Sequence, residues 1–193
     1  MQRDLVAETA SFREELSALV ERRLERDAPG RPELVELLRT YLNEVPIALD
    51  VLAPVVGETS QRLLEVGSGI GAVAVCLAEL GFEVVGLEPG GPGFEDLPQV
   101  QRTLMEVATE LQSPQAATSH VMNLRIEELD SEAHGRFDVV FSINVLEHVD
   151  DPIIALDRMQ MMLNESGVQR HVCPNYSFPY EPHFFIPLLP LRP

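Results

Sequence analysis

The first 55 residues carry apolar side chains at the three- and four-residue spacing of amphipathic helices. The apolar positions of the first helix are Phe12, Leu16, Leu19, Val20 and Leu24, and those of the second are Leu34, Leu38, Tyr41, Leu42 and Leu49. Residues 28–30 end the first helix, and the second runs from Pro32 towards Pro54 with a bend at Pro46. Residues 1–55 are therefore predicted to form a helical extension. It would serve either as a lid over a substrate or as a shield for one edge of a sheet.

After Gly57 the pattern changes to short apolar runs separated by helical segments, as is typical of strand–helix–strand units. Strands are predicted at 62–66, 83–87, 120–124, 137–142 and 168–173, and helices at 70–80, 97–111 and 153–163. Strands joined by helices imply right-handed crossovers and a parallel sheet. Residues 56–193 are therefore predicted to form one layered α/β domain.

The composition argues against one class of partner and indicates the cellular compartment. The chain has 31 acidic and 14 basic residues, and its formal net charge of −17 repels phosphate backbones, so nucleic acid is not an expected partner. Cys76 and Cys173 stand among apolar neighbours, as buried free thiols do in a reducing compartment. The N-terminus is charged and no apolar run approaches the roughly 20 residues of a membrane span, so we expect a cytoplasmic protein.

A glycine-rich turn follows the first predicted strand. Segment 63–71 reads Leu-Leu-Glu-Val-Gly-Ser-Gly-Ile-Gly and runs from a buried strand into a helix. At the carboxyl ends of parallel strands, the missing β-carbons of glycines let a nucleotide approach the backbone closely. Gly67, Gly69 and Ala72 also satisfy the dinucleotide spacing G-x-G-x-x-A, so this motif alone leaves an NAD-dependent oxidoreductase open.

Two acidic residues favour a different ligand. Glu65 lies two positions before the first glycine, where a carboxylate can hold, through water, the ammonium group of a methionine moiety. A pyrophosphate has no use for a negative charge at this place. Glu88 ends the second strand, where its carboxylate can accept hydrogen bonds from both hydroxyls of a ribose. The chain also lacks a recognisable catalytic Tyr-Lys pair, which argues against the oxidoreductase.

These residues resemble a known family. Glu65-x-Gly67-x-Gly69-x-Gly71 together with Glu88 is similar to the first two motifs of class I S-adenosylmethionine-dependent methyltransferases. Segment 137–149, which reads FDVVFSINVLEHV, is similar to their fourth-strand signature, and the likeness covers roughly residues 45 to 185. The resemblance implies a Rossmann-like, three-layer α/β domain with a mostly parallel sheet, and S-adenosylmethionine as the cofactor.

The resemblance also implies individual roles at the cofactor. The glycine turn would face its methionine end, and Glu88 its ribose. Ile126 and Glu127 would lie against adenine, although Arg125 stands where many relatives have aspartate, and Ile143 and Asn144 would offer oxygens to the cofactor amine. The predicted cofactor-binding residues are Glu65, Gly67, Ser68, Gly69, Gly71, Glu88, Ile126, Glu127, Ile143 and Asn144.

Two segments are candidates for chemistry on a small-molecule acceptor. Where the acceptor is a hydroxyl, a histidine base suits removal of its proton, and His148 follows the fourth strand in a Glu147-His148 pair. In quinone-precursor O-methyltransferases, which this stretch resembles, the pair follows another acid three positions earlier and can help to hold a divalent metal. Asn144 takes that position here, so no metal is predicted. The alternative is that residues 146–148 open the next helix.

The second segment, 173–187, is rich in aromatic residues and prolines and follows the fifth strand. Tyr176, Tyr180 and His183 are its predicted substrate contacts, with His183 as the alternative base. An aromatic cap over the end of the sheet is the equally weighted alternative.

The C-terminal part differs from the seven-stranded sheet that the resemblance implies. About 20 residues follow Cys173, and they contain five prolines from Pro179 onward, so we expect five strands and not the last two. We expect a C-terminally incomplete domain. Either the chain is a truncated product, which is the favoured explanation, or a second copy or another partner covers the exposed sheet edge. The predicted function is methyl transfer to a small molecule, and the alternative is a cofactor-binding module without catalysis.

Overall fold

The computed structural model describes residues 3–57, 59–113, 116–174, 180–181 and 186–187. Its helices are α1 (Leu5–Glu8), α2 (Ala10–Asp27), α3 (Pro32–Leu52), α4 (Ala72–Glu79), α5 (Leu97–Leu111), the 3-10 helix η1 (Ile126–Glu128), α6 (Ser131–His134) and α7 (Pro152–Met161). Its strands are β1 (Arg62–Val66), β2 (Glu83–Leu87), β3 (Ser119–Met122), β4 (Phe137–Ile143), β5 (Leu163–Val172), β6 (Tyr180–Glu181) and β7 (Ile186–Pro187).

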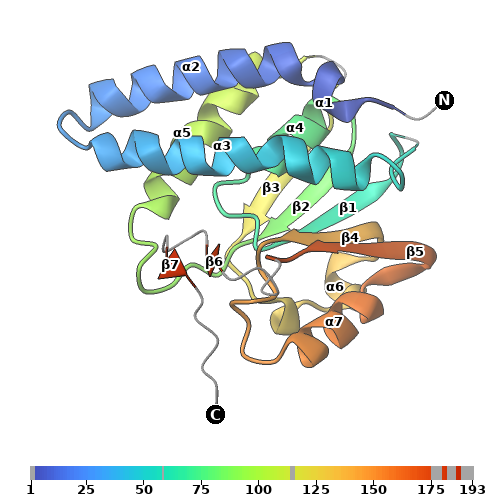
Figure 1. Ribbon diagram of the computed structural model, residues 1–193. Coiled ribbons are helices and arrows are strands. Elements are labelled where there is room, and N and C mark those ends of the chain that lie inside the picture. Colours follow the sequence, from blue (N-terminus) through green and yellow to red (C-terminus); the bar gives the residue numbers. More distant parts are fainter. Residues whose placement is uncertain (1–2, 58, 114–115, 175–179, 182–185, 188–193) are drawn as a thin grey trace.

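The first five strands form one parallel sheet in the order β3-β2-β1-β4-β5. Helices α2 to α5 cover one face of this sheet and α6 and α7 cover the other, which gives three layers (Figure 1). The chain adds β2 and β3 on one side of β1 and then β4 and β5 on the other side. Because all five strands are parallel, the carboxyl ends of β1, β2 and β4 lie at one edge of the sheet. The predicted Rossmann-like α/β fold with five parallel strands is confirmed.

The two faces of the sheet belong to separate apolar cores. Alternating residues of β1 divide between them, because Leu63 packs with the α2–α5 layer and Leu64 with the α7 layer. The N-terminal helices share the first core with the sheet, since Leu16, Leu38 and Val139 are all fully buried in it. The N-terminal helices are thus part of the same core as the sheet.

Most element boundaries agree with the sequence pattern, and β1, β2 and α5 agree residue for residue. Strand β5 begins at Leu163, five residues before its predicted start. A register irregularity places Phe137 opposite Leu163 but Val139 opposite Val168, so β5 accommodates extra polar residues as a bulge. Helix α3 continues through Pro46 without a break, where a bend was predicted.

Within the described residues the main sheet has the five predicted strands, and two further short strands, which the sequence did not predict, follow β5. β6 and β7 are two-residue strands that pair antiparallel with each other, in a small sheet separate from the main one. Proline is compatible with such a short ladder because only one side of each strand is paired. Within the described residues β5 remains the edge of the main sheet. None of the helices described here is long and apolar enough to cross a membrane.

Shortening a core side chain of α3 should destabilise the whole domain, because α3 shares its core with the sheet. Leu38→Ala, at a fully buried position, is expected to lower the free energy of unfolding by about 2–5 kcal/mol. Ile47→Ala, at a half-exposed position of the same helix, should cost less than about 1 kcal/mol. Urea unfolding followed by circular dichroism measures both, and equal effects would show that α3 is not part of the core.

Candidate functional site

The glycine bend, residues 67–71, lies at the carboxyl end of β1. Gly67, Gly69 and Gly71 have φ angles of 72°, 52° and 80°, the left-handed region that favours glycine. The amides of Gly67 and Ser68 both donate to the carbonyl oxygen of Leu87, at 2.8 and 2.9 Å. These two hydrogen bonds tie the bend to the end of β2, where Glu88 follows.

The Glu88 carboxylate lies on the glycine bend, as the sequence predicts. Its Oε2 accepts a hydrogen bond from the Gly69 amide at 2.9 Å, and its Oε1 accepts one from the Gly90 amide at 3.0 Å. The Glu88 amide donates to the carbonyl oxygen of Met122, which fixes the backbone at this point. The carboxylate therefore faces the bend with both oxygens held by backbone amides.

Glu65 is buried beneath the bend on the α4 face of the sheet. Its side chain is 4% exposed, and its Oε2 has no hydrogen-bond partner within the described part of the chain. Burial raises the pKa of this carboxyl well above 4.5, the charges of Glu88 and Glu44 raise it further, and the Ala74 amide partly offsets them. An orphaned, buried oxygen at this place fits the ammonium-holding role that the sequence predicts.

Two side chains that the sequence did not single out for the site contact the same bend. The ring of Tyr41, from α3, lies so close to Gly69 that a β-carbon there would collide with it. Burial raises the pKa of Tyr41 to about 12, and the charges of Glu88 and Glu44 contribute. Gln101, from α5, donates from Nε2 to the Gly69 carbonyl oxygen at 2.7 Å. Helix α3 is therefore part of the wall of the site.

The tip of β4 completes this edge of the sheet. Asn144 has a φ of 52° and is the one described non-glycine residue in the left-handed region. Its amide N–H donates to the Val172 carbonyl oxygen at 2.9 Å, and its Nδ2 donates to Oε1 of Glu44 at 3.0 Å. Ile143, just before it, is buried in the core. Sequence reasoning did not single out Glu44, which contacts this tip.

The other predicted cofactor residues are Ser68, which lies in the bend itself, and Ile126 and Glu127 in η1. The Ser68 hydroxyl is buried against Gly86 of β2 and has no hydrogen-bond partner among the described residues. In η1, the Ile126 side chain packs in the core of the α7 face, whereas Glu127 is exposed. The structure thus brings together the bend, Glu65, Glu88 and Asn144, and leaves the adenine contacts a prediction.

The predicted base His148 lies in a turn between β4 and α7. It is exposed, and its backbone amide donates to the Val145 carbonyl oxygen at 2.8 Å. Helix α7 begins at Pro152, and Asp151 caps it by accepting from the Ile153 and Ile154 amides. The alternative that residues 146–148 open this helix is therefore wrong. In the part of the chain that the structure describes, no three His, Cys, Asp or Glu side chains are grouped to hold a metal.

The predicted substrate contacts cannot be placed in the same way. Tyr176 and His183 lie outside the described residues. Tyr180 begins β6, and its side chain lies outside the described residues as well.

Another histidine, which the sequence did not single out, lies on the opposite face of the sheet. Nδ1 of His171, in β5, is 2.8 Å from the Ser142 hydroxyl in β4, and its Nε2 is 2.9 Å from Oε1 of Gln169. Burial lowers the pKa of His171. Gln169 in turn donates to the Gln160 side chain of α7, so this network fastens α7 to the sheet.

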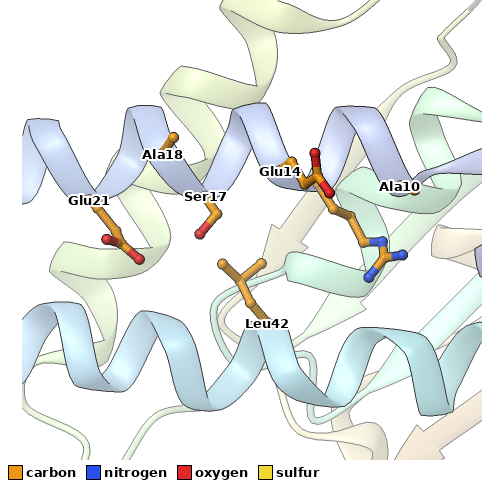
Figure 2. Close-up of a pocket in the computed structure, with 7 residues that line it drawn as sticks. Ala10, Glu14, Ser17, Ala18, Glu21 and Leu42 are labelled. Atoms are coloured by element: carbon orange, nitrogen blue, oxygen red, sulfur yellow. The ribbon is translucent and has the colours of Figure 1, made fainter.

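A surface hollow between α2 and α3 lies outside the predicted site. Figure 2 shows that polar side chains of α2 and Leu42 of α3 border it. Its lining residues are Ala10, Arg13, Glu14, Ser17, Ala18, Glu21 and Leu42, and none of them is a predicted site residue. We therefore assign it no role in the chemistry.

The buried Glu65 should make stability depend on pH in the absence of ligand. Since the folded chain holds this proton more tightly than the unfolded chain, its stabilising contribution is present below about pH 4.5 and is lost as the pH rises through the folded pKa. Glu65→Gln should therefore gain stability relative to the parent chain between about pH 5 and about pH 8. Urea unfolding at both pH values measures it, with the exposed Glu36→Gln as the control. A pH-independent difference would contradict the assignment.

Comparison with known proteins assigns the family. Residues 10–184 match the methyltransferase-domain family. The chain is 40% identical over 125 residues to the uncharacterized protein Rv1509 of Mycobacterium tuberculosis, covering 65% of this chain and 40% of that protein. It is 29% identical over 154 residues to the ubiquinone biosynthesis O-methyltransferase of Xanthomonas campestris pv. campestris, covering 80% of this chain and 56% of that enzyme. The chain thus spans about half the length of these relatives or less.

Solved structures agree with the fold. The CcbJ methyltransferase from Streptomyces caelestis superposes with a TM-score of 0.51 at 24% identity, covering 66% of this chain and 48% of that one. The family match decides between the two interpretations of the glycine turn, in favour of the S-adenosylmethionine site and against NAD. The chain belongs to the methyltransferase-domain family, the S-adenosylmethionine-dependent class that its glycine motif predicts.

Proposed function

We propose that this chain transfers a methyl group from S-adenosylmethionine to a hydroxyl oxygen of a small molecule. The observation that carries the proposal is the meeting of Glu65, Glu88 and Asn144 around the glycine bend. Carboxylates and a polar strand end are the acceptors that the hydroxyl and ammonium donors of an adenosyl-amino-acid ligand require. The hydroxyl acceptor rests on the likeness to the ubiquinone biosynthesis O-methyltransferase of Xanthomonas campestris pv. campestris.

The proposed cofactor contacts follow from the strand ends. The Glu88 carboxylate accepts hydrogen bonds from the ribose hydroxyls, through the lone pairs that the Gly69 and Gly90 amides do not use. Glu65 and the tip of β4, Ile143 and Asn144, hold the amino-acid end, while Gly67, Ser68 and Gly71 shape the backbone beneath it. Ile126 and Glu127 are assigned to adenine. Residues 1–55 form the cover and 56–193 the cofactor-binding domain in this proposal.

The bound sulfonium supplies the methyl group and the leaving group, so the protein chiefly aligns the acceptor and excludes water. His148 takes the acceptor's hydroxyl proton, since it is exposed at the carboxyl end of β4, next to the proposed cofactor site. Tyr176, Tyr180 and His183 stay proposed acceptor contacts, with His183 as the alternative base. The net charge of −17 favours a small acceptor over nucleic acid. A partner or second copy at the β5 edge remains a prediction.

Removing the Glu88 carboxylate should weaken cofactor binding. Glu88→Ala is expected to bind S-adenosylhomocysteine roughly 10- to 100-fold more weakly, because it loses charge-assisted hydrogen bonds to the ribose. Calorimetric titration measures the affinity, thermal unfolding checks the fold, and Glu95→Ala in the exposed loop that follows is the control. If the parent chain bound neither S-adenosylmethionine nor S-adenosylhomocysteine, the proposed function would be wrong.

Replacing His148 should separate catalysis from binding. His148→Ala is expected to lower methyl transfer by about 10²- to 10⁴-fold while the affinity for S-adenosylhomocysteine is unchanged. Transfer of a radioactive methyl group to a panel of hydroxylated aromatic compounds measures it, and His120→Ala, exposed on β3, is the control. Cofactor binding by the parent chain without transfer to any acceptor would instead support the module without catalysis.

A further inference from the structure

Helix α3 places two polar side chains, one turn apart, at the carboxyl ends of the central strands. Tyr41 contacts Gly69 on the bend, and Glu44 reaches the tip of β4. Figure 1 shows that α3 lies across the face of the sheet that α2 to α5 cover, beside α2 and in front of α4. A helix 10 residues before β1 in sequence therefore contributes directly to the space above the bend.

The hydrogen bond between Glu44 and Asn144 fixes the orientation of both side chains. A carboxylate can only accept, so the amide nitrogen of Asn144 must face Glu44, at 3.0 Å. The amide oxygen of Asn144 then points away from Glu44 and is left as an acceptor. Oε1 of Glu44 is engaged by this contact, and Oε2 is not hydrogen-bonded within the described part of the chain.

The charges around this contact are unbalanced. Glu44 and Glu88 both act electrostatically on the buried Glu65, whose Oε2 has no hydrogen-bond partner among the described residues. None of the ion pairs found in the described ranges includes any of these three acids. The charges of Glu44 and Glu88 disfavour the charged form of Glu65, and a ligand group that brings a positive charge offsets this effect. The feature that demands a ligand is the buried, unpaired Glu65 oxygen.

We propose that Glu44 is a further cofactor-binding residue, whose carboxylate accepts a hydrogen bond from the ammonium group of the methionine moiety beside the Asn144 amide oxygen. This inference rests on the proposed function. It makes α3 a part of the cofactor site, with Tyr41 as the wall against Gly69, and the N-terminal helices thus bind the cofactor as well as cover the domain. Glu44 contributes the charge on the α3 side, opposite Glu65 on the sheet side.

The test compares two ligands that share the adenosyl group. S-adenosylhomocysteine carries the amino-acid moiety, and 5′-methylthioadenosine lacks it. Glu44→Gln should bind S-adenosylhomocysteine roughly 10- to 100-fold more weakly, because the charge that pairs with the ammonium group is gone. Its affinity for 5′-methylthioadenosine should stay within about threefold of the parent chain. Glutamine keeps an oxygen that accepts from Asn144, so the contact to β4 is preserved.

Calorimetric titration gives both affinities, and Glu36→Gln, exposed on the same helix, is the matched control. A second measurement uses the analogue of S-adenosylhomocysteine without its amine: the parent chain should lose affinity with it, and Glu44→Gln should lose much less. Equal weakening of both adenosyl ligands, or no weakening of either, would overturn the role of Glu44. Failure of the parent chain to bind S-adenosylhomocysteine would instead overturn the proposed function.

Discussion

The pair of hydrogen bonds from the glycine bend to the Leu87 carbonyl oxygen holds the site together. They join the end of β1 to the end of β2, so that Glu88 emerges directly over Gly69. The bend can adopt this path because three of its residues are glycines with positive φ. The parallel register of β1 with β4 then brings Asn144 to the same edge. Backbone geometry thus sets the position of each polar group in the site.

The buried carboxyl group of Glu65 is the characteristic electrostatic feature of this edge of the sheet. Desolvation disfavours the charged form of Glu65, and neighbouring carboxylates add to the effect. The charges of Glu88 and Glu44 also raise the pKa of Tyr41, whose phenol ring lies against the bend. An ammonium group of a ligand would favour the charged form of Glu65 and offset the cost of its burial, whereas an anionic phosphate would add to that cost. The electrostatics therefore agree with the family in separating this site from a dinucleotide site.

The local sequence pattern was sufficient to predict the parallel sheet and the glycine motif that follows β1. The apolar runs at β1 and β2 show no helical periodicity, and the apolar residues of α5 from Leu97 to Leu111 are regularly spaced. The predicted first and last residues of these three elements therefore agree with the structure. At β5 the polar run 164–167 looks like a turn in sequence, and only its pairing with β4 makes it a bulged strand. Glu44 gave no sequence signal either, because its partner Asn144 is 100 residues away. Tyr41 occupied an apolar position of a helix, and the pattern could not distinguish core packing from contact with Gly69.

Pro46 removes one backbone hydrogen bond from α3, close to the residues that border the glycine bend. A proline within a helix has no N–H to donate to the carbonyl four residues earlier, which here belongs to Leu42. The turn that lacks this hydrogen bond, residues 42–46, includes Glu44 and directly follows Tyr41, whereas Leu49 and Leu52 beyond it are fully buried. The part of α3 that borders the glycine bend is therefore held by one backbone hydrogen bond fewer than a helix without proline would have.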